Sequence, residues 1–163
     1  MTALARPWLF PVIVASMAAA LVAMLGATMT DLGPWYRSLA KPGWAPPDLA
    51  YPVVWTAVFA LTALAGVTAW RHARSRAAVD WLVALAALNG FLNILWSMLF
   101  FRLARPDWAG VEVVALIAST AALLWVAARQ SRTAGLMLLP YLAWVMVAAL
   151  LNWEIVRLNG PFG

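Results

Sequence analysis

The chain has 163 residues, of which 66% are hydrophobic and only 10% are charged. An ordinary soluble domain carries about 25% charged residues, so this composition excludes a water-soluble core and points to a lipid environment. The net charge is +5, but the cations lie between apolar runs, which is typical of residues flanking membrane spans and not of a nucleic-acid-binding patch. With no cysteine and a single histidine, His72, disulfides and thiol catalysis are excluded, and no metal site is expected.

Five apolar runs follow one another along the chain. They cover residues 8–29, 47–70, 79–101, 108–128 and 134–156. Each is close to the ~20 residues that a helix needs to cross a bilayer, and none shows the in/out alternation of a β-barrel strand. The first run exceeds the apolar core of a cleaved signal peptide, so we expect it to be retained. The sequence predicts an all-α integral membrane protein, a single domain over 1–163 with a bundle of five transmembrane helices.

The first connector, residues 30–46, differs from the others. It leads into "WYRSLAKPGWAPP", which runs from Trp35 to Pro47 and holds two tryptophans, a tyrosine, two cations and three prolines. Prolines fix φ and stiffen the backbone, and the aromatic rings supply a large apolar surface. We expect a structured lid over one end of the bundle, with a loop lying in the headgroup region as the alternative. The later connectors are short and polar, and in "RLARPD" Pro106 and Asp107 suit the first turn of a helix.

Three of the runs carry aromatic stripes at helical spacing. The stripes are Pro52, Trp55, Phe59 and Gly66; Asn89, Asn93, Trp96 and Phe100; and Tyr141, Trp144, Ala148 and Asn152. Asparagine in a span is costly when it faces lipid, so these faces should point inward. Asn93 and Asn152 either hold helices together or line a cavity. With the aromatic rings beside them, the second interpretation predicts a pocket for a flat, largely apolar ligand.

The eleven tryptophans divide into two groups. Those near predicted span ends fit the interfacial belt, namely Trp8, Trp70, Trp81, Trp108 and Trp153. Trp96 and Trp144 fall inside their runs and must pack helices or line a cavity.

Orientation is only weakly encoded. The N-terminal side would hold Arg6, Arg71, Arg74, Arg76, Arg129 and Arg132, and the other side Arg37, Lys41, Arg102, Arg105 and Arg157. Most acidic residues fall on the second side, namely Asp31, Asp48, Asp107, Glu112 and Glu154. We predict a cytoplasmic N-terminus with the long loop outside. Helical spans favour a location in a bacterial inner membrane and do not exclude the outer membrane.

Small residues recur four apart at Ala15, Ala19 and Ala23 and again at Ala86 and Gly90. Such faces permit close helix contact, either in a homodimer or within the bundle.

Four motifs, taken together, resemble the TspO/MBR family of tryptophan-rich sensory and translocator proteins. They are "WYRSLAKPGWAPP", "YPVVWT" from Tyr51, "LNILWSMLFF" from Leu92 and "PYLAWVMVAALLN" from Pro140. The resemblance implies five transmembrane helices and homodimers. It also implies binding of porphyrins such as protoporphyrin IX and haem, of sterols, and of benzodiazepine-type ligands. Some bacterial members of the family promote light-dependent breakdown of protoporphyrin IX.

The resemblance also carries residue roles. It links Trp35 and Trp144 to the photochemistry and places Tyr36, Asn93, Trp96, Ala148 and Asn152 against the ligand. With the aromatic stripes and the lid cations that would meet propionates, the predicted ligand-binding set is Trp35, Tyr36, Arg37, Lys41, Trp44, Trp55, Phe59, Asn93, Trp96, Phe100, Tyr141, Trp144, Ala148 and Asn152. Two departures from the family's motifs weaken the inferences about ligand preference and sterol binding. "YPVVWTAVF" moves one phenol of the usual second-span motif, and Trp153 replaces the tyrosine of a proposed sterol motif.

Two classes of function follow. One is a membrane receptor or translocator that binds tetrapyrroles for sensing or transport; the other is a light- and oxygen-dependent enzyme that degrades them. A third hypothesis is a purely structural scaffold in the membrane. No cofactor is required, and no constellation of residues resembles an acid–base catalyst.

Overall fold

The computed structural model describes residues 9–162, and this part of the chain contains helices and no strand. The helices are α1 (Leu9–Met29), α2 (Pro34–Ser38), α3 (Ala50–His72), α4 (Arg76–Ser97) with the π-helical turn η1 (Met98–Arg102), α5 (Pro106–Gln130) and α6 (Arg132–Asn159). Five of these elements, with α4 and η1 counted as one, are long and apolar enough to cross a membrane. The all-α, five-helix architecture is therefore confirmed, while Arg6 and Trp8 lie outside the described residues.

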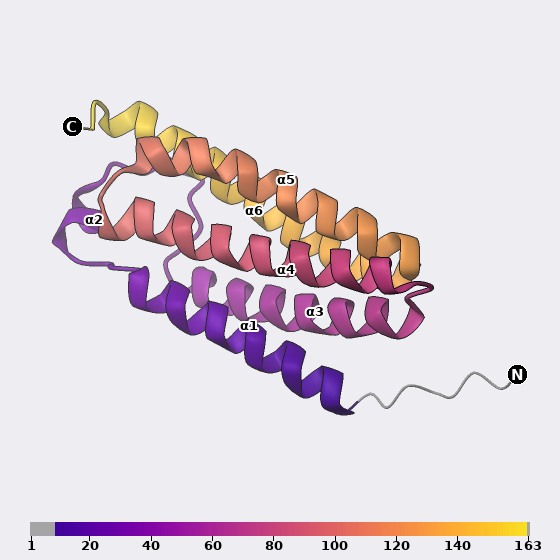
Figure 1. The fold of residues 1–163 in the computed structure, drawn as a ribbon. Helices are drawn as coiled ribbons and strands as arrows, with labels where there is room; N and C mark the ends of the chain where they lie inside the picture. The colour runs from indigo at the N-terminus through magenta and orange to yellow at the C-terminus, as the bar shows by residue number, and fades with distance from the viewer. Residues whose placement is uncertain (1–8, 163) are drawn as a thin grey trace, which may run out of the picture.

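The five long helices lie side by side in a bundle (Figure 1). Each packs against two principal neighbours, in the ring order α1, α3, α6, α5, α4 and back to α1. The odd number of spans places the start of α1 and the end of α6 at opposite ends of the bundle (Figure 1). Short connectors join α3 to α4 and α5 to α6 at one end, which we call the connector end. The long loop joins α1 to α3 at the other, the loop end.

Most helix ends lie a few residues beyond the apolar runs. α4 begins at Arg76, where the side chain of the N-cap Ser75 accepts a hydrogen bond from the Ala78 amide at 3.2 Å. α6 continues to Asn159, past the last purely apolar turn. Hydropathy marks where lipid begins, whereas a helix continues as long as its backbone hydrogen bonds do. Pro106 opens α5 with Asp107 in its first turn, as predicted.

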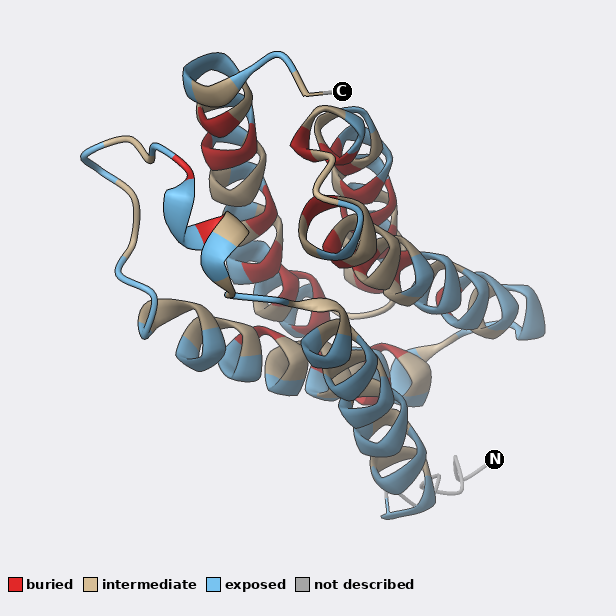
Figure 2. Cartoon of the chain, turned by 90° about the vertical axis from the view of Figure 1, so that its left-hand side faces the viewer, coloured by how far each residue is buried: buried red, intermediate tan, exposed pale blue. Residues whose placement is uncertain are grey.

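Burial is unequal around the ring (Figure 2). α1 has no buried residue, whereas α5 and α6 each have eight among the residues described. The largest fully buried side chains include Tyr141, Leu138 and Ile155 of α6. Exposed leucines, valines and methionines on the outer faces are suited to lipid contact. The tightly packed part of the molecule is thus the side built by α4, α5 and α6.

The loop from Thr30 to Leu49 contains the short helix α2 and folds against the end of the bundle. Tyr36 and Leu39 are buried there in a cluster with Phe100, Leu151 and Ile155. The loop therefore covers the end of the bundle as a lid and is held there by apolar contacts. The alternative, a loop lying in the headgroup region, did not predict these contacts.

Candidate functional site

A cavity of about 1090 Å³ lies inside the bundle beneath the loop. Its wall comes from α1, α3, α4, η1, α6 and the loop, while α5 stays behind the other helices. Nine of the predicted ligand-binding residues line it: Tyr36, Trp55, Phe59, Asn93, Trp96, Phe100, Trp144, Ala148 and Asn152. The lining is predominantly apolar, with a few polar side chains, as is usual for sites that bind small organic molecules.

One aromatic wall is built by α3 and α6. Trp55 stacks on Phe59, one helical turn away, with ring centroids 5.3 Å apart. The same indole meets Trp144 edge-on at 6.4 Å, and Trp144 meets Tyr51 at 6.0 Å. These edge-to-face and stacked arrangements are the ones that aromatic quadrupoles favour, so the rings hold one another in place.

A second aromatic wall comes from the end of α4. Trp96 stacks on Phe100 with centroids 5.1 Å apart, and Phe101 packs against both rings. The turn from Met98 to Arg102 is π-helical, with the Leu103 amide donating to the Met98 carbonyl at 2.9 Å. The wider turn lets Phe100 line the cavity while Phe101 also contacts Tyr36 of the loop.

The two asparagines of the cavity wall also bridge helices. Asn152 accepts from Trp96 Nε1 at 3.2 Å and donates to the Pro106 carbonyl at 2.7 Å. Asn93 donates to the Tyr141 hydroxyl at 3.3 Å. The two asparagines therefore do both things considered from the sequence: they hold helices together and they line the cavity.

A polar network stands behind that wall. The Tyr141 hydroxyl donates to Asn89 Oδ1 at 2.7 Å, and Asn89 Nδ2 donates to Ser119 at 2.9 Å and Thr120 at 2.8 Å. All four side chains are buried, so the network links α4, α5 and α6 where no water competes. Tyr141 is not part of the cavity lining; it supports Trp55 from behind, with centroids 6.2 Å apart.

The loop closes the site through Tyr36. Its hydroxyl donates to Asp48 Oδ1 at 3.3 Å, and Lys41 Nζ lies 3.7 Å from the ring centroid and 3.7 Å from Asp48. Burial, together with the negative charge of Asp48, raises the pKa of Tyr36 well above its ordinary value, so the phenol stays neutral. The Lys41 ammonium is thus already engaged within the loop.

The loop is also tied to the C-terminal end of α6. Asn159 accepts from the Ala40 amide at 2.8 Å and donates to the Ala40 carbonyl at 2.9 Å. Sequence reasoning missed Asn159 because nothing in its surroundings links it to a loop 119 residues away. Asp48 was also missed as part of the site, although an acid beside Lys41 in an aromatic loop was an available signal.

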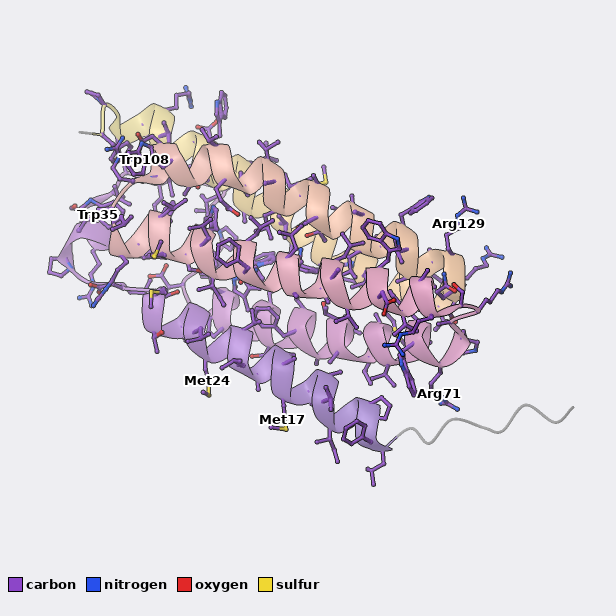
Figure 3. The ribbon with its side chains drawn as sticks, viewed as in Figure 1. Met17, Met24, Trp35, Arg71, Trp108 and Arg129 are labelled. Carbon is purple, nitrogen blue, oxygen red and sulfur yellow. The ribbon has the colours of Figure 1, made fainter. Side chains whose placement is uncertain are left out.

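The remaining predicted residues lie outside the lining. Trp35 packs edge-on against Phe100 at 6.1 Å, one layer behind the wall. Arg37 is exposed and donates to the Leu32 carbonyl at 3.0 Å, and the Trp44 side chain is 51% exposed. Figure 3 shows Trp35 at the loop end of the molecule, with Trp108 close to it in the view. Their roles toward a ligand stay predictions.

Helix α1 contributes small residues to the cavity, which the sequence analysis did not anticipate. Ala19, Ala23 and Gly26 all line the cavity, so two members of the alanine stripe serve the inside of the bundle. Gly90 of the second small-residue pair faces Val22, whose Cγ2 would lie 2.9 Å from an added Cβ. These residues pack within one chain, which was the alternative to a dimer face.

Two buried polar groups have no hydrogen-bond partner among the described residues. They are the Trp144 indole N–H, beside the cavity, and the carboxylate of Glu112 on α5. No group of three or more potential metal ligands occurs in the part of the chain that the structure describes.

Five long apolar helices, four of which line an aromatic cavity, define an integral, multi-pass membrane protein. Residues 8–158 match the model of the TspO/MBR family, and the chain belongs to that family. It is 39% identical over 144 residues to the tryptophan-rich protein TspO of Chlorobaculum tepidum, covering 85% of this chain and 89% of the relative.

Other relatives extend the comparison. The chain is 36% identical over 125 residues to the tryptophan-rich sensory protein of Cereibacter sphaeroides, covering 77% of each. It is also 36% identical over 130 residues to the translocator protein of Ovis aries, covering 77% of this chain and 75% of the relative. The chain is thus related both to bacterial sensory proteins and to a mammalian translocator protein.

Proposed function

We propose that this protein binds a porphyrin, such as protoporphyrin IX or haem, in the aromatic cavity beneath the loop and serves in tetrapyrrole sensing or transport. The observation that carries the proposal is the cavity of about 1090 Å³ between the Trp55 and Trp96 walls. Aromatic rings from two separate clusters in the lining of a wide cavity suit a flat macrocycle, which gains both stacking and apolar burial. The names of the relatives support a receptor or translocator role in general terms.

The charged edge of such a ligand constrains how it would enter. Propionates favour cations, and the loop supplies Arg37 at its surface and Lys41 beside Tyr36. Lys41 would have to exchange Asp48 for a propionate, whereas Arg37 is bonded only to a backbone carbonyl among the described residues. We therefore expect Arg37 to contribute more than Lys41 to the affinity for a dicarboxylic porphyrin.

The test is a dark titration of the purified protein with protoporphyrin IX, followed by tryptophan fluorescence. Saturable quenching near one porphyrin per chain is expected. Ala148→Phe, which would fill the cavity, should weaken binding at least tenfold, while Ala115→Phe on the exposed face of α5 should leave it unchanged. Quenching that never saturates, as in empty micelles containing a free tryptophan analogue, would contradict the proposal.

A second candidate activity is light- and oxygen-dependent degradation of the bound porphyrin. Trp144 lies in the cavity wall and Trp35 contacts the wall residue Phe100, so two indoles stand in or next to the site. An excited porphyrin can pass its energy to dioxygen, and the singlet oxygen formed then adds to the macrocycle and opens it. It can also take an electron from an indole and pass that electron to dioxygen, which is reduced to superoxide while the indole is left oxidised. Illumination in air should then give a new product spectrum. If Trp35→Phe and Trp144→Phe both leave that loss of porphyrin unchanged, the indoles have no part in it.

We propose a bacterial inner-membrane location with the N-terminus in the cytoplasm and the loop outside. Because the chain has no cysteine, single cysteines can report on sidedness without background. Gly43→Cys in the loop should react with an impermeant maleimide in spheroplasts, and Ser75→Cys in the α3–α4 connector should react only after lysis. The reverse labelling pattern would show that the loop lies in the cytoplasm and the N-terminus outside.

A homodimer is a further proposal, and of the small residues singled out in the sequence only Ala86 is exposed. Single-molecule photobleaching in liposomes would count the subunits. A sterol site is not supported by the residues at Trp153, whose indole is 61% exposed and lies near Arg157.

A further inference from the structure

The connector end of the bundle gathers five arginines from two connectors that are far apart in sequence. They are Arg71, Arg74, Arg76, Arg129 and Arg132. The Arg74 amide donates to Gln130 Oε1 at 3.4 Å, which joins the α3–α4 connector to the end of α5. Figure 3 shows Arg71 and Arg129 at the same end of the molecule, opposite Trp35 and Trp108. These residues therefore form one basic cluster, the connector-end cluster.

The charge of this cluster is largely uncompensated. Of its members only Arg76 has a carboxylate within 4 Å among the described residues, Asp80 at 3.2 Å. At the loop end three of the five cations are matched, since Lys41 pairs with Asp48, Arg105 with Asp107, and Arg157 with Glu154, while Arg37 and Arg102 have no carboxylate within 4 Å among the described residues. The hydrogen bonds that Arg105 donates to the Asp107 carboxylate also raise the pKa of Arg105. Each end has five cations among the described residues, but four of them are without a carboxylate partner at the connector end and only two at the loop end.

Tryptophans fix the depth of the connector-end cluster in the bilayer. The Arg129 guanidinium lies 4.9 Å from the Trp125 ring centroid, and that ring is 59% exposed on the outside of α5. Trp81, just over one turn after Arg76 on α4, is 62% exposed. Exposed indoles at span ends settle at the level of the headgroups, so the adjacent guanidinium groups reach the phosphates.

We propose that the connector-end cluster is a docking surface for anionic phospholipid headgroups. A guanidinium binds a phosphate with two parallel hydrogen bonds, and a juxtamembrane group of four or more cations is the pattern that retains acidic lipids. A lipid fits better than a soluble phosphate because the exposed indoles beside the arginines offer acyl chains and glycerol an apolar flank. This surface is separate from the cavity and does not depend on what the cavity binds.

The test uses the full chain in detergent and native mass spectrometry with phosphatidylglycerol or phosphatidylcholine. The purified protein should retain phosphatidylglycerol in preference to phosphatidylcholine, and the preference should weaken as ionic strength rises. Arg74→Gln/Arg132→Gln, both at exposed positions, should lower phosphatidylglycerol affinity on the order of tenfold. The matched control, Arg102→Gln/Arg157→Gln, removes the same charge from the loop end and should change it less than twofold.

Three outcomes would overturn the proposal. The first is equal retention of the two lipids by the unmodified protein. The second is the same loss of affinity in both double variants, which would mean that net charge alone matters. The third is displacement of the lipid by inorganic phosphate at a similar concentration, which would identify a soluble anion as the occupant. Arg74→Lys/Arg132→Lys, which keeps the charge, separates the forked hydrogen bonds from simple attraction: partial retention is expected, and full loss would argue against a charged surface.

Discussion

The α1 side and the α5–α6 side of the ring are built from similarly apolar sequence, yet they are packed very differently. α5 and α6 bury side chains along most of their length, whereas α1 buries none and lines the cavity mostly with alanine, serine and glycine, together with Val12 and Met24. Small residues near a cavity leave volume unfilled, and dense packing elsewhere must hold the fold. The comparison teaches that α1 borders the cavity without adding to the packed core, that α5 adds to the core without bordering the cavity, and that α6 does both.

Adding a methyl group at individual glycines is the clearest test of this difference in packing. A Cβ added at Gly135 would lie 2.6 Å from Ala128 Cβ and 3.1 Å from its Cα, so α6 would have to move from α5. Gly135→Ala should therefore lower stability by about 2–3 kcal/mol. Thermal unfolding in detergent, followed by circular dichroism, measures this loss. An unchanged melting temperature would show that the α5–α6 contact is not tight.

The next largest effect is expected at Asn152. Asn152→Ala removes the acceptor of the Trp96 indole and the donor to the Pro106 carbonyl, both in a partly or fully buried setting. A loss of about 1–3 kcal/mol follows from leaving such groups unpaired. Porphyrin affinity should fall as well, because Trp96 would lose its fixed orientation. Asn89→Ala, which leaves the cavity lining intact, should lower stability with a smaller change in affinity.

Gly90 tests the contact between the two sides. Its added methyl would meet only the Val22 side chain of α1, at 2.9 Å, and α1 is not buried. Gly90→Ala should therefore lower stability by less than about 1 kcal/mol, since α1 can shift. A loss as large as that of Gly135→Ala, in the same unfolding experiment, would mean that α1 is held as rigidly as α6.

Gly26 on α1 serves as the control position for the substitutions at Gly135 and Gly90. No atom lies within 4 Å of an added Cβ there. Gly26→Ala should leave stability unchanged or raise it by roughly 0.5–1 kcal/mol, because alanine is the better helix former. A clear loss of stability would show that α1 is more tightly packed than it is in this structure.

The smallest effect concerns pH and the loop, which docks on the packed side. Because burial raises the pKa of Tyr36, the unfolded phenol loses its proton first as pH rises above its ordinary value of about 10. The folded state then holds more protons, so the stability of the docked loop falls above about pH 10. Limited proteolysis of the loop should accelerate there, and Tyr36→Phe should remove part of that dependence.

Most of the fold could be predicted because the bilayer imposes both the length and the helical form of each span. Nine of the fourteen predicted site residues line the cavity, eight of them from the three stripes, because helical spacing places residues three and four apart on one face of each span. Partners across helices were not predictable: which carbonyl Asn152 would meet, or that Asn159 would hold Ala40, depends on how spans are arranged around the ring. The role of α1 was missed because the four-residue spacing of Ala15, Ala19 and Ala23 fits a face in contact with another helix as well as it fits a cavity wall.

The π-helical turn at Met98–Arg102 has a consequence for chain length. Such a turn holds one residue more than the α-helix it interrupts, so it behaves as a one-residue insertion stored inside a span. Removing a single residue from this turn would restore regular α-helical winding and change the directions in which the side chains of the turn point from the helix axis. Phe100 and Phe101 could then no longer serve the cavity and the loop together. The register of the aromatic wall is set by a count of residues as well as by their identity.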